Sequence, residues 1–332
     1  MPPLLRVDDL KTHYFGFGGS RVVKAVDGVS FTVEAGETFG LVGESGCGKT
    51  TTCHSIVRLL PPSARIVGGR IELAGANLLE LGARKMREVR GRRIASILQD
   101  PMASLDPLFS IGNQVAEPAY YHGLLRGGAL RRRVTELLAA VRIPSPEKRR
   151  REFPHQMSGG MRQRIVGAIA QAGGPQLIIA DEPTTNLDVT IQLQYLNLLK
   201  ELQRATGVAL IFVTHNLGIV AKMCDTVAVM YAGKTVEMQS VRGLFYTPRH
   251  PYTQALLASI PKLGIKEPLY AVPGQPPYLA ALPGGCSFHP RCAHATKRCR
   301  TQEPPEQATG DGGTTRCWLA GAPGGSSEVA HA

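Results

Sequence analysis

The chain has 332 residues, 43% of them hydrophobic, and a formal net charge of +12. This length supports one large domain with its own core, or a domain with an appendage. No apolar run is long enough to cross a bilayer, and the first ten residues lack the charged start and long apolar stretch of a signal peptide. We therefore expect a cytosolic protein that reaches a membrane only through a partner.

The basic residues are concentrated in three runs, at residues 84–93, 131–133 and 148–151. Solvated helix faces in an arginine-rich composition explain these runs most simply. A second interpretation is that the protein functions close to an anionic lipid surface. Nucleic-acid binding comes third, because no aromatic residues are interleaved with the basic ones as platforms for bases. We expect no nucleic-acid partner.

Apolar strand patterns alternate with helical ones along the first 245 residues, which predicts an α/β fold. The pattern predicts strands within residues 22–42 and a mostly helical segment at about 100–165. The other predicted elements are a helix at Thr50–Leu60, central strands of a parallel sheet at Leu177–Ala180 and Val208–Val213, and a hairpin strand at Thr226–Tyr231.

Prolines recur after about residue 245 and leave little room for long regular elements. We therefore predict one domain at 1–245, with its helical subdomain at about 100–165, and a small proline-rich extension at 246–320. The glycine- and serine-containing residues 321–332 predict a disordered tail.

The strongest local signal is Gly43–Thr50, which fills all four fixed positions of the phosphate-binding loop pattern. Glycines let backbone N–H groups surround phosphates, and the following helix directs its positive end at the same anion. Lys49 is expected to reach the β- and γ-phosphates, and the Thr50 hydroxyl to hold Mg²⁺. A chance glycine-rich turn is improbable, because a strand precedes the loop and a helix follows it. The residues expected to contact a nucleotide here are Gly43, Ser45, Gly46, Cys47, Gly48, Lys49, Thr50 and Thr51.

Two adjacent carboxylates, Asp181 and Glu182, follow the apolar strand at Leu177–Ala180. Asp181 is expected to support Mg²⁺ through its water shell, and Glu182 to polarise the attacking water. Adjacent residues at a strand end point in different directions, which allows the two roles to differ. An acidic turn would be the better interpretation if no phosphate loop preceded it.

A second anion cradle is predicted at Ser158, Gly159 and Gly160. Ser158 is a suitable N-cap for a helix, and the N–H groups exposed there can bind an anion. The phosphate loop of the chain already binds one nucleotide. A second anion-binding site therefore predicts a second chain whose nucleotide this site would contact.

The order of these motifs resembles that of the ATP-binding cassette (ABC) family, over residues 14–215. The resemblance implies ATP and Mg²⁺ as cofactors and roles for three further residues. Gln99 matches the glutamine loop, which touches Mg²⁺ and relays to the membrane subunit, and Asp188 matches the D-loop. His215 matches the switch histidine, so Glu182, His215 and Gln99 are the expected catalytic residues.

The adenine-stacking aromatic residue implied by the same resemblance is Tyr14, with Phe15 and Phe17 as close rivals. The sequence departs from the usual family residues at three positions, Met157, Met161 and Asn216. Neither methionine removes a required donor, since the serine and both glycines of the signature are present.

A narrower resemblance, over residues 6–318, is to the ATPase subunits of oligopeptide and dipeptide permeases, a group that also includes nickel importers. The stretches that carry it are Gln99–Pro107, Pro154–Arg164, His250–Thr253, Pro273–Pro277 and Gly285–Cys292. It implies an ATP-hydrolysing importer subunit at the cytoplasmic face of the membrane. Its implied partners are a second ATPase chain closing head to tail, two membrane permease subunits, and, indirectly, an extracytoplasmic solute-binding protein. The second ATPase chain is either a copy of this chain or, as we expect, a related one.

Other functions remain open at this point. An importer of nickel complexes or other small solutes fits the same motifs. A nucleic-acid-associated ABC protein would suit the positive charge, but such proteins usually join two cassettes or carry a coiled coil. An exporter motor is a further alternative, although exporters usually fuse cassette and membrane domain and lack this extension.

Four cysteines gather near the C-terminus: Cys286, Cys292, Cys299 and Cys317. Four thiolates can close around a tetrahedral ion or a cubane cluster. The short C-x-x-C pairs common in structural zinc sites are absent, which weakens the case for a zinc site. Disulfides do not suit a cytosolic protein. Four unligated thiols are the alternative. The permease resemblance implies a [4Fe–4S] cluster that staples the proline-rich segment.

Overall fold

The computed structural model describes residues 2–16, 21–185, 187–261, 270–310 and 312–320. The predicted tail at 321–332 and Phe17 lie outside the described residues. The chain divides into two compact units, each made of three separate segments. The first unit comprises Met1–Arg6, Thr32–Phe39 and Ile71–Val213, and the second comprises Val7–Phe31, Gly40–Arg70 and Thr214–Ala332. The predicted domain boundary at residue 245 stays a prediction.

A four-stranded sheet has the order β2-β1-β4-β5. Its strands are β1 (Leu5–Gly16), β2 (Arg21–Val33), β4 (Ala64–Leu73) and β5 (Ala76–Asn77). Along β1, Leu5, Val7 and Leu10 are fully buried between exposed or half-buried residues, as expected for a strand with one face on the core.

The first unit contains three parallel strands, β6 (Ile94–Ile97), β7 (Leu177–Asp181) and, up to Val213, β8 (Ala209–Thr214). Strands β7 and β8 were predicted from their apolar runs, whereas β6 was not predicted. β7 pairs in parallel with both neighbours, and all five of its residues are buried. Strands buried on both faces need continuous apolar runs, which explains why the sequence showed β7 and β8 clearly. Because Asp181 ends β7, its carboxylate lies at the carboxyl edge of these strands.

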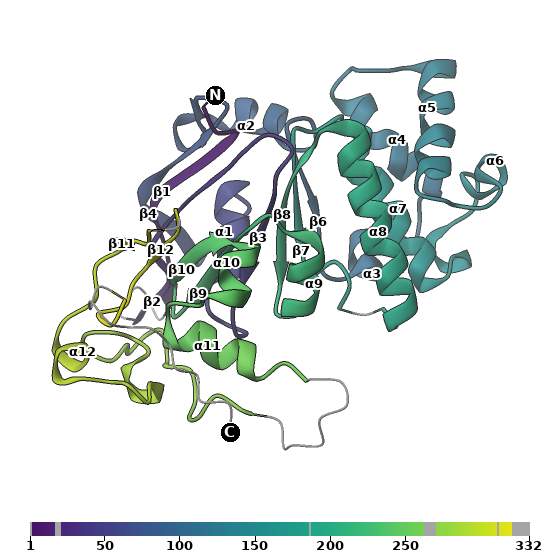
Figure 1. Ribbon diagram of the computed structural model, residues 1–332. Coiled ribbons are helices and arrows are strands. Elements are labelled where there is room, and N and C mark those ends of the chain that lie inside the picture. Colours follow the sequence, from purple (N-terminus) through teal and green to yellow (C-terminus); the bar gives the residue numbers. More distant parts are fainter. Residues whose placement is uncertain (1, 17–20, 186, 262–269, 311, 321–332) are drawn as a thin grey trace. The chain divides into compact units, whose positions relative to one another are not determined.

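The predicted helical segment of the first unit is confirmed. Helices α4 (Ile111–Tyr121), α5 (Gly127–Ala140) and α7 (Gly159–Ala172) pack against one another (Figure 1) through buried residues such as Val115, Leu138 and Ile165. The remaining elements of this unit are η2 (Leu78–Glu80), α2 (Ala83–Val89), α3 (Pro101–Ser104), α6 (Pro146–Arg149), η3 (Pro154–Gln156) and α8 (Val189–Thr206).

The second unit holds strand β3 (Thr38–Val42) from Gly40 onwards, helix α1 (Lys49–Ile56) and the predicted hairpin of β9 (Thr226–Tyr231) and β10 (Lys234–Ser240). Its other helices are α9 (Leu217–Met223), α10 (Val241–Tyr246), α11 (Pro251–Ala258), η4 (His289–Arg291) and α12 (Lys297–Thr301). Helix α1 ends before the predicted Leu60.

The C-terminal extension continues the sheet of the second unit. Strand β12 (Thr314–Thr315) pairs antiparallel with β10, and β11 (Gln307–Ala308) pairs with β12. The order at this edge is therefore β11-β12-β10-β9. The extension is attached through backbone hydrogen bonds as well as side chains, although its own elements are short.

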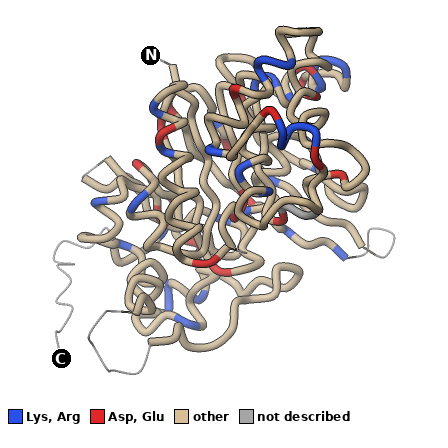
Figure 2. Tube along the Cα trace, turned by 90° about the vertical axis from the view of Figure 1, so that its right-hand side faces the viewer, with Lys and Arg blue, Asp and Glu red and all other residues tan. Residues whose placement is uncertain are grey.

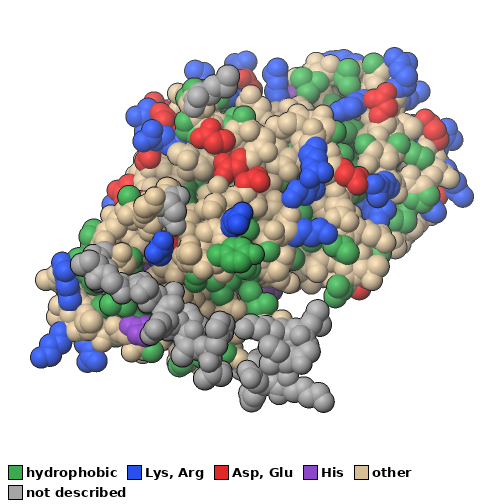
Figure 3. Space-filling view, in the orientation of Figure 1, with side chains coloured by type: hydrophobic (Ala, Val, Ile, Leu, Met, Phe, Trp, Pro, Cys, Tyr) green, Lys and Arg blue, Asp and Glu red, His purple; other side chains and the backbone are tan. Residues whose placement is uncertain are grey.

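Arginines of the basic runs such as Arg84 in α2 and Arg131 in α5 are exposed on helices of the first unit. Others form ion pairs with neighbouring acids, such as Arg133 with Glu136 and Arg150 with Glu147. Figure 2 shows blue and red segments close to one another along parts of the tube, and Figure 3 shows both signs interspersed on the face drawn. This is the distribution expected of solvated helix faces. Within the described part of the chain, none of the helices has the length and apolar character needed to span a bilayer.

Candidate nucleotide site

The phosphate loop, Gly43–Thr50, connects β3 to α1 in the second unit. At two positions of the loop, the backbone of a neighbouring strand approaches so closely that only glycine fits. A Cβ atom would lie 2.2 Å from the Met230 carbonyl oxygen at Gly43, and 2.2 Å from the Ala25 carbonyl oxygen at Gly48. Gly48 also has a φ of +109° and is the N-cap of α1. The loop is thus seated directly on the backbone of β9 and β2.

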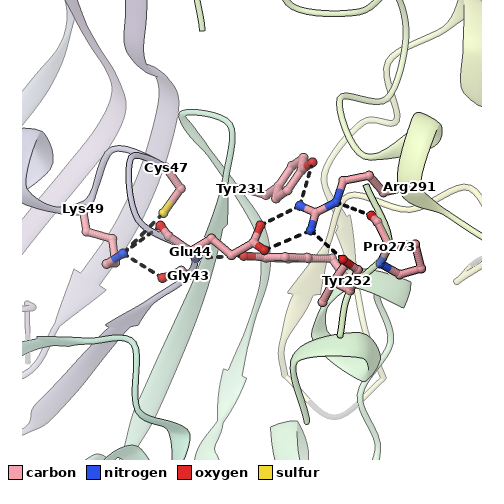
Figure 4. A network of polar contacts seen from close by, with 9 residues as sticks. Gly43, Glu44, Cys47, Lys49, Tyr231, Tyr252, Pro273 and Arg291 are labelled. Atoms are coloured by element: carbon pink, nitrogen blue, oxygen red, sulfur yellow. Dashed lines mark hydrogen bonds and ion pairs between the residues drawn. The ribbon is translucent and has the colours of Figure 1, made fainter. Parts of the chain in front are cut away.

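Lys49 is 6% exposed and folds back over this loop. Its Nζ donates to the carbonyl oxygens of Gly43 at 2.7 Å and Glu44 at 3.0 Å (Figure 4). Burial raises the pKa of the Cys47 thiol, so Cys47 stays neutral beside the lysine. The other predicted contact residues, Ser45, Gly46 and Thr50, are exposed, and Thr51 is half-buried.

His215 lies in the same unit as the loop and lines a cavity of about 300 Å³ together with Gly43, Glu44 and Ser259. The structure therefore brings the predicted switch histidine and the phosphate loop to one cavity. The next residue, Asn216, is the N-cap of α9, and its Oδ1 accepts from the N–H groups of Gly218 and Ile219. An asparagine supplies the same acceptor oxygen as the aspartate common at this position, which explains the departure from the family pattern.

Tyr14 is the aromatic residue that lies beside the phosphate loop helix. Its hydroxyl is 3.4 Å from Oγ1 of Thr51. Its described rival, Phe15, instead lies under the guanidinium of Arg65, 5.7 Å from the ring centroid. The adenine-stacking role of Tyr14 stays a prediction.

In the first unit, the predicted acidic pair and the glutamine loop lie together. Oε2 of Glu182 accepts hydrogen bonds from Nε2 of Gln99 at 3.2 Å and from Oγ1 of Thr185 at 3.0 Å. The backbone of Glu182 has a φ of +47°, a left-handed conformation that costs a non-glycine residue about 1–2 kcal/mol. Its N–H donates to the carbonyl of Val213, which helps to hold this turn. Such strain, held in place by surrounding bonds, is typical of functional positions.

The predicted second cradle begins α7. Ser158 is the N-cap, and its Oγ accepts from the N–H of Met161 at 3.3 Å, as the sequence predicted. Ser158 and Gly159 are exposed, whereas Met157 is only 3% exposed. The methionine in place of the usual leucine is therefore a change inside the core, and it leaves the exposed face of the signature unaltered.

Asp188 is the N-cap of α8 and accepts from the N–H groups of Thr190 and Ile191. This structural role was not predicted. A carboxylate at this place also complements the positive end of the helix.

The four cysteines of the extension, Cys286, Cys292, Cys299 and Cys317, all line one small cavity. Burial raises the pKa of three of these thiols, to about 11 for Cys317, and neighbouring thiols raise it further. However, among the described residues no group of three or more His, Cys, Asp or Glu is arranged to hold a metal ion. The predicted iron–sulfur cluster is thus not supported, because the sulfurs share a cavity without forming a ligand set.

Comparison with known proteins places these features in a family. Residues 26–185 match the ABC transporter family, and residues 236–299 match the C-terminal region of oligopeptide/dipeptide transporters. The chain is similar to the probable peptide ABC transporter ATP-binding protein y4tR of Sinorhizobium fredii, with 49% identity over 95% of this chain and 94% of that protein. It is also similar to the dipeptide transport ATP-binding protein DppD of Bacillus subtilis, with 46% identity over 96% of this chain and 95% of that protein.

Among solved structures, the dimeric structure of MJ0796, a bacterial ABC transporter cassette, is similar with a TM-score of 0.64 and 25% identity, over 72% of this chain and 99% of that one. The predicted fold and both levels of family resemblance are thereby confirmed. The chain belongs to the ABC transporter family, as an ATP-binding subunit of the oligopeptide/dipeptide transporter type.

Proposed function

We propose that this ATPase drives an ABC importer for dipeptides and oligopeptides. The observation that carries the proposal is that one compact unit contains both a complete phosphate loop and the peptide-transporter C-terminal region. Similarity to proteins named for peptide and dipeptide transport extends over at least 95% of the chain.

The proposed roles in ATP hydrolysis are those that the family resemblance implies for each residue. Lys49 binds the β- and γ-phosphates, and Tyr14 stacks on adenine. Thr50, Gln99 and Asp181 would hold Mg²⁺, which would supply positive charge to balance the phosphates. Glu182 polarises the attacking water, since its carboxylate is already oriented by hydrogen bonds from Gln99 and Thr185. His215 contacts the γ-phosphate.

The proposed assembly is a head-to-tail pair with a related but different ATPase chain. The exposed N-terminus of α7, at Ser158 and Gly159, supplies N–H donors to the nucleotide on the partner's phosphate loop. The pair works at the cytoplasmic face of the membrane on two permease subunits, which receive cargo from an extracytoplasmic solute-binding protein. ATP binding closes the pair, and hydrolysis resets it.

We also propose that the four-cysteine cavity takes up a [4Fe–4S] cluster. Its support is that four thiols, the side chains that usually bind such a cluster, line one cavity, although the described residues do not arrange them as a ligand set. Protein purified without oxygen should be brown, and Cys292→Ser should remove the colour while Cys224→Ser, a buried cysteine outside the cavity, should not. Colourless protein without iron would eliminate this proposal.

The test of transport uses the complete transporter in liposomes with its solute-binding protein. ATP-dependent uptake of a labelled tripeptide is expected, and Glu182→Gln should abolish it. The matched control is Glu201→Gln, because Glu201 is an exposed glutamate paired only with Arg142 among the contacts described. Uptake of a nickel complex but of no peptide would instead support the nickel importer.

A further inference from the structure

Glu44, the second residue of the phosphate loop, is bound by the C-terminal extension through its side chain (Figure 4). Nη1 of Arg291 donates to Oε2 of Glu44 at 2.6 Å, and Nη2 donates to Oε1 at 3.0 Å. This is the bidentate geometry in which a guanidinium binds a carboxylate most strongly. The loop and the extension, far apart in sequence, are thus joined at one residue.

The Arg291 guanidinium is itself held in place by several groups. Its Nε donates to the carbonyl of Pro273 at 2.8 Å, and Nη2 donates to that of Val272 at 3.3 Å. It also lies 5.8 Å from the ring centroid of Tyr231, and its side chain is only 4% exposed. The hydrogen bonds that Arg291 donates to Glu44 raise the pKa of the guanidinium above its ordinary value, so it stays charged. Little conformational freedom remains to be lost when it binds the carboxylate.

A second residue of the extension binds the backbone of Glu44. The N–H of Glu44 donates to the hydroxyl of Tyr252 in α11 at 2.9 Å. Tyr252 is fully buried, with its ring centroid 4.6 Å from that of Tyr231 and 5.3 Å from that of Phe288. Burial raises the pKa of Tyr252 well above its ordinary value, so the hydroxyl remains neutral. Since this N–H is engaged by α11, it is not one of the donors left for phosphate.

The third polar group of Glu44, its carbonyl oxygen, accepts from Nζ of Lys49 at 3.0 Å. The same residue therefore connects the extension on one side with the phosphate-binding lysine on the other. Displacement of Glu44 would move an acceptor of Lys49 and the start of the loop together.

We propose that Arg291 and Tyr252 are positioning residues of the phosphate loop, through which the C-terminal extension sets the affinity for ATP. This inference rests on the proposed role of the loop in binding phosphate. It concerns binding of the ground-state nucleotide, so loss of the contact should raise KM for ATP more than it lowers kcat.

The experiment uses the complete transporter and measures kcat and KM for ATP, together with the Kd of a fluorescent ATP analogue. Arg291→Gln should raise KM and Kd about ten-fold, the scale of one hydrogen bond to a charged group, and change kcat less than about three-fold. Arg291→Lys should restore part of the affinity, because a lysine can still form one of the two hydrogen bonds to Glu44. Glu44→Gln combined with Arg291→Gln should be no weaker than the worse single variant, since both remove one shared contact.

Two controls separate this role from a general loss of stability. Arg298→Gln removes another arginine of the extension, one that contacts Trp318 and Gln302, and should leave KM unchanged. Tyr252→Phe is a milder change and should raise KM even if Arg291→Gln folds poorly. If Arg291→Gln and Tyr252→Phe lower the melting temperature but keep KM at the wild-type value, the proposal is wrong and the contacts only pack the extension.

Lys49→Ala distinguishes failure of this inference from failure of the proposed site. If Lys49→Ala weakens nucleotide binding and the Arg291 and Tyr252 variants do not, only the positioning role is refuted. If Lys49→Ala also binds the analogue normally, the loop is not the phosphate site. Both the proposed site and the positioning role of Arg291 and Tyr252 are then wrong.

Discussion

His250 makes the stability of the second unit depend on pH. It is the N-cap of α11, where its Nδ1 accepts from the N–H of Tyr252 at 3.0 Å, and it is 1% exposed. Burial lowers the pKa of His250 from 6.5 to about 4. The imidazole is therefore neutral in the folded protein at pH values where an unfolded chain would carry the proton.

The sign and size of the effect follow from this difference in pKa. Between pH 6.5 and about 4 the unfolded state binds a proton that the folded state excludes, so the free energy of unfolding falls as the pH falls through this window. Between pH 7.5 and 5.5 the His250 contribution amounts to a loss of about 1.4 kcal/mol, because the unfolded histidine becomes largely protonated at the lower pH.

Urea unfolding at the two pH values measures this loss, with Trp318, the single tryptophan, as the fluorescent probe in the same unit. The matched variant is His250→Asn, because asparagine keeps an acceptor for the N-cap but does not titrate. The pH-dependent drop in the urea midpoint should be larger in the wild type by roughly 0.5–1.4 M, given common slopes of unfolding.

Glu237 also titrates nearby, and its carboxylate accepts the N–H of His250. Burial raises the pKa of Glu237, which shifts stability in the opposite direction as the pH falls, but this contribution is present in both proteins and cancels in the comparison. Equal pH dependence of the wild type and His250→Asn would show that the histidine does not exclude a proton as argued.

Three further predictions concern the first unit. Glu182→Gln should retain nucleotide binding but slow ATP hydrolysis about 10²–10⁴-fold, the scale of losing a positioned base, and near-normal turnover with the partner would contradict the assignment. Ser158→Arg should lower the ATPase rate of the paired complex while this chain binds nucleotide normally, whereas full activity would argue against a shared site. Gln163 is 1% exposed, and its Nε2 donates to the carbonyl oxygen of Pro183 at 2.6 Å. Gln163→Leu should therefore reduce the free energy of unfolding, measured by urea titration, by about 1–3 kcal/mol. An unchanged urea midpoint would mean that this carbonyl finds another donor.

Features encoded by local spacing were predictable from the sequence. The phosphate loop depends on glycines at fixed intervals, and the close approaches at Gly43 and Gly48 show why no other residue fits there. Strand β7 was visible because burial on both faces demands an unbroken apolar run. Ser158 was recognisable as an N-cap because its side chain completes a bond within three residues.

Features that depend on distant contacts were not predictable. Glu44 occupies a position where the loop pattern accepts any residue, and its partner Arg291 lies 247 residues further along the chain. Strands β11 and β12 contain two residues each, too few to show a period, and exist because β10 offers an edge for pairing. Likewise, the cysteine spacing predicted a ligand set, whereas the folded chain only brings the thiols to a common cavity.

The path of the chain through its two compact units limits how the protein can be divided. The chain changes unit after residues 6, 31, 39, 70 and 213, and strands β1 to β4 each contain residues of both units. A single proteolytic cut therefore cannot release either unit whole. A fragment starting at Thr214 would carry Arg291 without Glu44, so its buried guanidinium would lack the carboxylate that neutralises it. The extension and the loop must consequently be inherited, exchanged or engineered together rather than as interchangeable parts.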